Sequence, residues 1–275
     1  MKKMKRIFFP FLIVSITLSL VVGYGFIKRG NTASAASKKI TVKDFTLTLP
    51  KNWSNHYVMK KSKKIRQGSF VAFYAKKCYN ETREGWLFSI MRYKDDSYLD
   101  MPSYELVGKW NGYHYVAIFP TDVQTEGATE TAGKEYAKLN TGSRKAAMSI
   151  RPVKTRRKGK GVYRASDFSL LLPANWKNNY IVKNKGKKKK DSYVFFCAKK
   201  CYEQTGEGTL FSIARYTDES YQELPSYELA GMWNGVYYVA VFPTDVQFIG
   251  ATKAAVRQYT KCNQSVKKVV KSIQP

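Results

Sequence analysis

Two nearly identical stretches decide the fold: SYELVGKWNGYHYVAIFPTDVQ at Ser103–Gln124 and SYELAGMWNGVYYVAVFPTDVQ at Ser226–Gln247. In each, an Asn-Gly pair separates two runs of apolar and aromatic residues. Asn-Gly is favoured in two-residue hairpin turns because both turn positions need a positive φ. The chain is therefore predicted to form the same β-hairpin twice, 123 residues apart.

The repetition extends well beyond the hairpin. A shift of 123 residues aligns Phe45–Pro152 with Phe168–Pro275 without a gap, and about 59 of the 108 positions are identical. Solenoid repeats are about 20–50 residues long, whereas this period is close to the size of a whole domain. We predict two tandem repeat domains, residues 38–152 and 163–275, joined by a basic linker at 153–162.

Within each repeat, predicted strands precede a helix. Ser69–Ala75 and Trp86–Tyr93 are rich in aromatic and β-branched residues, which is typical of strands. From Ala255 to Ile273, apolar residues recur every three or four positions, as on one side of a helix. The predicted fold class is α+β, with an antiparallel sheet packed by a C-terminal α-helix in each repeat.

The Asn-Gly turn also predicts the register of the hairpin. The expected cross-strand pairs are Trp110 with Tyr113, Gly108 with Tyr115, and Leu106 with Ala117. All these side chains should share one face of the sheet, and the Tyr115 ring should lie across the bare backbone of Gly108.

Four aromatic residues of the hairpins are candidate binding residues. They are Trp110 and Tyr115 in the first repeat and Trp233 and Tyr238 in the second. The predicted register places them in the core, and the alternative is an aromatic platform for a sugar ring.

Residues 1–35 are predicted to be a signal peptide or an N-terminal membrane anchor. A cationic start precedes an uncharged run from Ile7 to Ile27, and Ala33–Ala35 offers a small-residue cleavage site. The run is long enough to span a bilayer, so both alternatives stay open. In either case we expect the repeats to be extracellular or on the cell surface.

The formal net charge of +28 indicates an anionic partner. The candidate contacts are Lys187, Lys188, Lys189 and Lys190 in a lysine-rich loop, and Lys253, Arg257 and Lys261 on the predicted helix. Export makes nucleic acid a poor candidate and favours an anionic wall polymer or lipid head groups. Two alternatives remain: the charges only keep the loops soluble, or the helix lies on a membrane through its apolar stripe.

The second repeat has two cysteines that the first lacks, Cys197 and Cys262. Because export permits disulfides, a bond between them is possible, and four free or buried thiols are the alternative. Cys197 and Cys201 should lie on one strand, too far apart to bridge each other. The cysteine spacing matches no zinc pattern, and no metal or other cofactor is predicted.

No catalytic constellation stands out. His56 and His114 are replaced by Asn179 and Tyr237 in the second repeat, so a histidine-dependent site could not operate in both. The acids that both repeats share could supply a carboxylate pair for glycoside cleavage, and they are Glu84/Glu207, Asp95/Asp218, Glu105/Glu228 and Asp122/Asp245.

The run from D-x-S-Y through P-S-Y-E-L, W-N-G and F-P-T-D-V-Q, with L-P-x-N-W upstream, resembles a domain of exported proteins in Firmicutes. The resemblance covers nearly all of both repeats. It implies a Gram-positive envelope setting and carries no catalytic residues. The F-x-L-x-L-P-x-N-W opening and the strands-then-helix order are also similar to the PsbP-like α+β fold.

Taken together, these patterns predict a non-enzymatic extracellular protein of the envelope that binds an anionic partner. The alternatives are a wall-active hydrolase that uses the shared acids, and a module that docks onto another envelope protein through exposed sheet edges.

Overall fold

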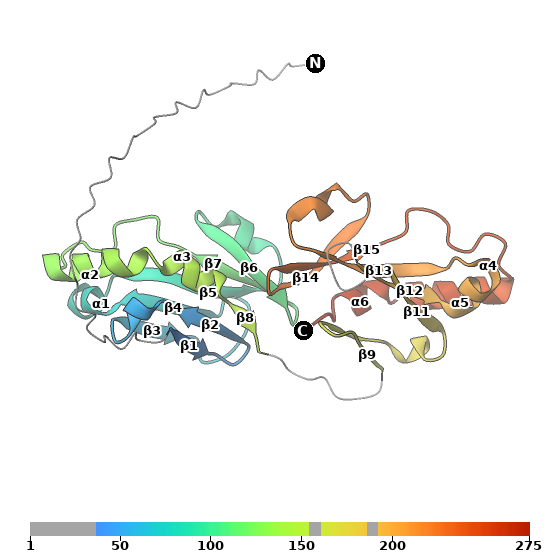
Figure 1. Cartoon of the computed structure of the whole chain (residues 1–275), viewed down its shortest axis with the longest axis horizontal. Coiled ribbons are helices and arrows are strands. Elements are labelled where there is room, and N and C mark those ends of the chain that lie inside the picture. The colour runs from blue at the N-terminus through green and yellow to red at the C-terminus, as the bar shows by residue number, and fades with distance from the viewer. Residues whose placement is uncertain (1–36, 154–160, 186–191) are drawn as a thin grey trace, which may run out of the picture. The chain divides into compact units, whose positions relative to one another are not determined.

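In the computed structural model, residues 37–153, 161–185 and 192–275 are described, and residues 35–275 form one compact unit. The α+β fold class is confirmed (Figure 1). The predicted N-terminal segment, most of the linker 153–162 and the lysines Lys187–Lys190 lie outside the described residues.

The first repeat contains eight described strands and three described α-helices. The strands are β1 Lys38–Thr41, β2 Phe45–Leu49, β3 Tyr57–Lys61, β4 Phe70–Ala75, β5 Trp86–Tyr93, β6 Tyr104–Trp110, β7 Tyr113–Ile118 and β8 Arg151–Pro152. The helices are α1 Lys76–Thr82, α2 Glu130–Asn140 and α3 Ser143–Met148, with short 3-10 turns at Lys51–Trp53 and Ser97–Asp100.

The elements of the second repeat follow the same order. The strands are β9 Val162–Arg164, β10 Ser169–Leu171, β11 Tyr180–Lys185, β12 Tyr193–Ala198, β13 Thr209–Tyr216, β14 Tyr227–Trp233 and β15 Val236–Val241. The helices are α4 Lys199–Thr205, α5 Lys253–Asn263 and α6 Val266–Val270, with 3-10 turns at Ala174–Trp176 and Glu219–Glu223.

Both repeats contribute to one ten-stranded sheet, in the order β11-β12-β13-β15-β14-β6-β7-β5-β4-β3. The halves meet where β6 and β14 pair antiparallel, with Met232 opposite Lys109 (Figure 1). Two small sheets, β1-β2-β8 and β10-β9, complete the described strands. The sequence predicted a separate sheet in each repeat, and the independence of the two domains stays a prediction.

The core lies between one face of the long sheet and a layer of helices and small strands. In the first repeat Phe45, Leu47 and Leu49 of β2 are buried there together with Trp53. Helix α2 packs on β4 and β5, and α5 packs on β12 and β13. Smaller apolar clusters, centred on Tyr98 in one repeat and on Tyr221 in the other, cover part of the opposite face.

Each predicted C-terminal helix is in fact two helices. The break falls at Thr141–Gly142 in the first repeat and at Gln264–Ser265 in the second. The Ser265 hydroxyl donates to the Cys262 carbonyl and accepts the Trp176 indole N–H at 2.8 Å, so the break is used to hold a core residue. The apolar stripe nevertheless continues through both helices and is buried, as in Ala255, Cys262, Val269 and Ile273.

The hairpin register is confirmed at two of three predicted pairs. Trp110 pairs with Tyr113, and Gly108 pairs with Tyr115. The prediction for Leu106 is wrong: it pairs with Val116, because a β-bulge at Val107 adds one residue to β6. An extra residue reverses the alternation of faces, so Leu106 joins the cluster on the opposite face of the sheet.

The ring that lies over Gly108 belongs to Trp110, not to Tyr115. A Cβ atom added to Gly108 would come within 1.9 Å of the Trp110 ring. Tyr115 stacks on the outer face of that indole, with 3.9 Å between ring centres. Trp233 and Tyr238 repeat the arrangement around Gly231.

Of the two alternatives for the cysteines, the structure has the free thiols and no Cys197–Cys262 disulfide: all four cysteines are free and buried. Along β12, Phe196 and Ala198 face the helices, so Cys197 between them points to the other side of the sheet. Cys201 was predicted on the same strand as Cys197, but it lies in α4, because the chain turns into that helix after Ala198. Burial raises the pKa of the Cys262 thiol to about 11.

Candidate functional site

The candidate site is the basic side of α5 and α6. Helix α5 begins at a capped end, where the Thr252 hydroxyl accepts the Ala255 N–H. Its apolar side, with Tyr259 and Cys262, is buried against the sheet. This packing turns the predicted contacts Lys253, Arg257 and Lys261 outward, and the structure leaves all three exposed.

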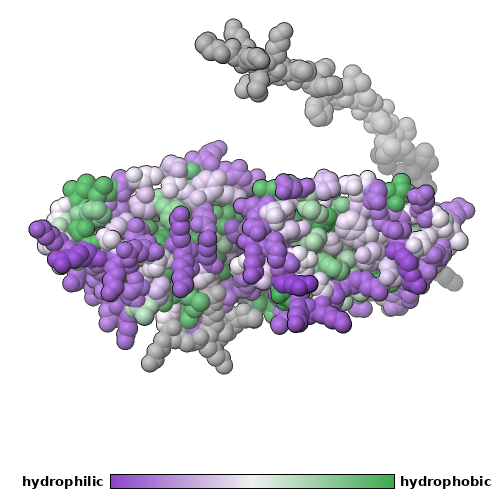
Figure 2. Space-filling view, turned by 180° about the vertical axis from the view of Figure 1, so that it is seen from behind, coloured by the Kyte–Doolittle hydropathy of each residue, from purple (hydrophilic) through white to green (hydrophobic). Residues whose placement is uncertain are grey.

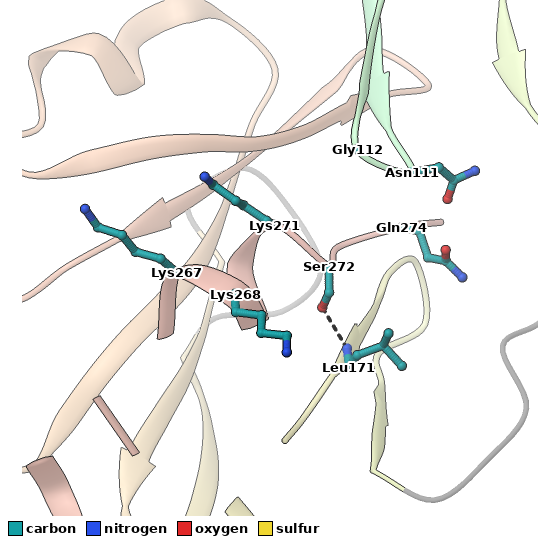
Figure 3. Close-up of a pocket in the computed structure, with 8 residues that line it drawn as sticks. All are labelled: Asn111, Gly112, Leu171, Lys267, Lys268, Lys271, Ser272 and Gln274. Carbon is teal, nitrogen blue, oxygen red and sulfur yellow. Dashed lines mark hydrogen bonds between the residues drawn. The ribbon is translucent and has the colours of Figure 1, made fainter. Parts of the chain in front are cut away.

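Helix α6 adds the exposed cations Lys267 and Lys268, and its C-cap residue, Lys271, adds a third. They line a hollow of about 700 Å³ together with Leu171, Ser272 and Gln274, and with the Asn111–Gly112 turn of the first repeat. The Ser272 hydroxyl accepts the Leu171 N–H at 2.8 Å and ties α6 to β10. In Figure 3 the three lysine side chains extend away from the backbone and do not converge on one point. Such an arrangement suits an extended anionic surface better than a single enclosed ion.

We call these six residues, Lys253, Arg257, Lys261, Lys267, Lys268 and Lys271, the basic face. Within the described part of the chain none of them forms an ion pair with a carboxylate. At the equivalent positions of the first repeat, Lys134 pairs with Glu130, and Arg144 lies 2.7 Å from Glu105. Two of the four cations at the equivalent positions of the first repeat, Lys134 and Arg144, are thus paired, whereas none of the six in the second repeat is, among the residues described.

The four aromatic candidates are core residues. Trp110 and Tyr115 are each 1% exposed, and Trp233 and Tyr238 are 3% exposed. Their ring faces are covered by each other and by the neighbouring glycine. The structure thus supports the core interpretation over a sugar-binding platform.

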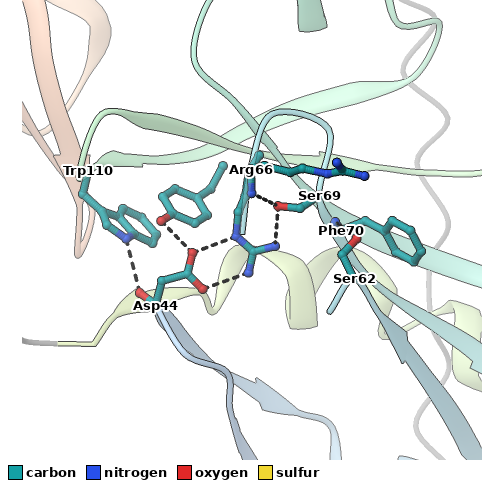
Figure 4. Close-up of polar contacts among 8 residues, drawn as sticks. Asp44, Ser62, Arg66, Ser69, Phe70 and Trp110 are labelled. Carbon is teal, nitrogen blue, oxygen red and sulfur yellow. Dashed lines mark hydrogen bonds and ion pairs between the residues drawn. The ribbon is translucent and has the colours of Figure 1, made fainter. Parts of the chain in front are cut away.

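A buried polar cluster in each repeat was missed at the sequence level, and Figure 4 shows the cluster of the first repeat. In the first repeat, Asp44 accepts two hydrogen bonds from Arg92, at 2.7 and 2.8 Å, and one from the Tyr115 hydroxyl at 2.9 Å. The Trp110 indole N–H donates to the Asp44 carbonyl. Arg92 also reaches the Ser69 hydroxyl. The Asp44 carboxylate thus links the turn before β2 to β5 and β7, and the Asp44 carbonyl adds a contact with β6.

The second repeat contains the same cluster, built from Asp167, Arg215, Tyr238 and Ser192. Burial opposes ionisation of Asp167, but the hydrogen bonds and charge of Arg215 prevail and lower the pKa of Asp167. Burial and the neighbouring carboxylate raise the pKa of the Tyr238 hydroxyl. Asp44 and Asp167 stand one residue before the aligned repeat begins, and starting the alignment one position earlier would have revealed them.

The acids shared by both repeats lie in different settings. Glu105 forms an ion pair with Arg144. Asp95 accepts hydrogen bonds from the backbone N–H and the hydroxyl of Ser97 in its own turn. Asp122 and Asp245 accept from the side chains of Gln124 and Gln247. These contacts orient loops, while Glu228 and Asp245 of the second repeat line the same pocket.

The face in Figure 2 is mostly hydrophilic, with hydrophobic residues in small separate areas. In the described ranges no helix is long and apolar enough to cross a membrane, and no group of three or more acidic, histidine or cysteine side chains is placed to hold a metal ion.

No protein-family model, curated protein or solved structure matches the chain.

Proposed function

We propose that this chain is a non-enzymatic extracellular binding protein of a Gram-positive envelope, and that its second repeat holds an anionic wall polymer. The observation that carries the proposal is the basic face: six exposed cations on two consecutive helices, without a carboxylate partner among the described residues. Uncompensated charges that share one surface add their potentials and attract polyanions.

The burial of the apolar stripe favours a polymer over a lipid bilayer. A helix that lies in a membrane must offer its apolar side to the acyl chains. In α5 that side consists of Ala255, Tyr259 and Cys262, all buried against the sheet. Only the charged side is available, so binding should be electrostatic and sensitive to salt.

The two repeats have different parts in this proposal. The second supplies the basic face, and the first supplies the Asn111–Gly112 turn beside α6. The loop Lys187–Lys190 would add charge to the second repeat, but it lies outside the described residues. The predicted export segment at residues 1–35 would place the unit outside the cell, as a secreted or tethered protein.

The proposal is tested by retention of the full chain on purified wall, with and without teichoic acid, at two salt concentrations. We expect retention that requires the anionic polymer and falls at high salt. Loss of retention at low salt would refute wall binding and favour docking onto an envelope protein. Release of soluble wall fragments, abolished by changing Glu105 and Glu228 to Gln together, would instead show a hydrolase.

A further inference from the structure

A pocket in the second repeat differs from its counterpart in the first. It has a volume of about 720 Å³ and lies where the start of β14 faces the break between α5 and α6. Its lining residues include the aromatic Phe242 and Tyr259, the acids Glu228 and Asp245, and Lys267, which also lines the hollow beside α6.

The first repeat shows what such a pocket accommodates. There the Arg144 guanidinium lies 2.7 Å from the Glu105 carboxylate and 5.8 Å from the centre of the Phe119 ring. The cation is thus held between a carboxylate and an aromatic ring, a combination that suits a planar guanidinium particularly well.

The second repeat retains the carboxylate and the ring but lacks that guanidinium. Glu228 and Phe242 stand at the positions of Glu105 and Phe119, while Lys267 replaces Arg144. Lys267 makes no ion pair with Glu228 within 4.0 Å, and Glu228 has no ion-pair partner among the described residues. A half-buried carboxylate is therefore left without a described ion-pair partner in a pocket that Phe242 and a second acid, Asp245, also line.

We propose that this pocket binds an arginine side chain of a partner polypeptide, between Glu228 and Phe242, in the place that Arg144 fills in the first repeat. The site is separate from the basic face in its chemistry, since it takes a cation. It would give the envelope protein a second, protein-directed contact, and its existence does not depend on polymer binding.

The probe is N-acetyl-arginine amide, titrated into the full chain at constant ionic strength and followed by NMR shifts of the Glu228 and Phe242 amides. N-acetyl-citrulline amide has nearly the same shape without the charge, and it should bind about tenfold more weakly or worse, because a charge-assisted contact is lost. N-acetyl-lysine amide should also bind less tightly. Equal binding of the citrulline or lysine compound would overturn the assignment of an arginine side chain.

The matched variants make the test specific to this pocket. E228Q should weaken binding about tenfold, whereas E105Q in the first repeat should leave it unchanged. K267R recreates the internal occupant of the first repeat, so it should block the probe. R144K should open a second site, with new shifts near Glu105 and Phe119. Binding that survives both E228Q and K267R would contradict the proposal.

Discussion

Both carboxylate oxygens of Asp44 accept hydrogen bonds from Arg92, and the side chains are only 10% exposed for Asp44 and 2% for Arg92. A buried pair of this kind adds little net stability compared with an apolar core. Removal of one partner is nevertheless strongly destabilising, because the other charge is left buried and unpaired. The same pair recurs as Asp167 and Arg215, where the acid is 33% exposed. The two repeats therefore provide an internal comparison of one interaction at two depths.

The first prediction follows from this difference in burial. D44N should lower the free energy of unfolding by about 3 kcal/mol, because Arg92 is left charged and unpaired. D167N should cost clearly less, since solvent can compensate Arg215 more easily. Urea unfolding of both variants measures the difference. Equal losses in the free energy of unfolding would mean that the burial of the ion pair does not control its contribution to stability.

The second prediction concerns acid. The pKa of Asp167 is lowered in the folded state, so its contribution to stability is complete above the unfolded value of about 4. That contribution is lost as the pH falls through the folded pKa. D167N should therefore lose less stability than the parent chain between pH 5 and pH 2, as followed by urea unfolding. An identical slope in both proteins would show that Asp167 is not a source of the acid sensitivity.

The third prediction concerns the glycine under the indole ring. G108A places a methyl group where the Trp110 ring lies, and the ring, which stacks on Tyr115, must shift from its position. Overpacking of this kind costs about 1–3 kcal/mol. Thermal unfolding and tryptophan fluorescence measure the effect. G133A is the control, because open space surrounds that glycine of α2 and alanine is favourable in a helix. A G108A protein as stable as G133A would contradict the packing described.

The fourth prediction concerns thiols. The protein should contain four free cysteines after unfolding, and its stability should not change with reductant. In the native state they should react slowly, since all four are buried and burial raises the pKa of each thiol. Peptide mapping without reduction provides the decisive result. Detection of a peptide that links Cys197 to Cys262 would show that the disulfide forms and would contradict this prediction.

The fifth prediction concerns the joint between the repeats. Because β6 and β14 pair in one sheet, cleavage in the linker 153–162 should leave two fragments that elute together from a sizing column. Fragments that separate at neutral pH would show that the pairing is too weak to hold the repeats together.

The predictions from sequence succeeded where the signal was local. The Asn-Gly turn gave the hairpin and the pairing of Trp110 with Tyr113, and the apolar period gave a buried stripe from Ala255 to Ile273. They failed where a single residue alters the geometry. The bulge at Val107 has no separate signal in a run of strand-forming residues, and it sends Leu106 to the opposite face.

Long-range contacts were the other limit. Nothing near Asp44 in the sequence points to Arg92 or Tyr115, which lie 48 and 71 residues away. The basic residues of α5 were predicted correctly as exposed, but their lack of partners became visible only beside the Glu105–Arg144 pair of the first repeat.

The most direct test of the proposed function compares equal charge changes at equivalent positions. R257Q/K261Q removes two cations from α5, and K134Q/K138Q removes the matching two from α2. Retention of the full chain on teichoic-acid-containing wall is measured across a series of salt concentrations. The α5 variant should elute at clearly lower salt than the parent chain, while the α2 variant should elute close to it. Equal losses in both variants would show that only net charge matters, and would contradict a binding surface on the second repeat.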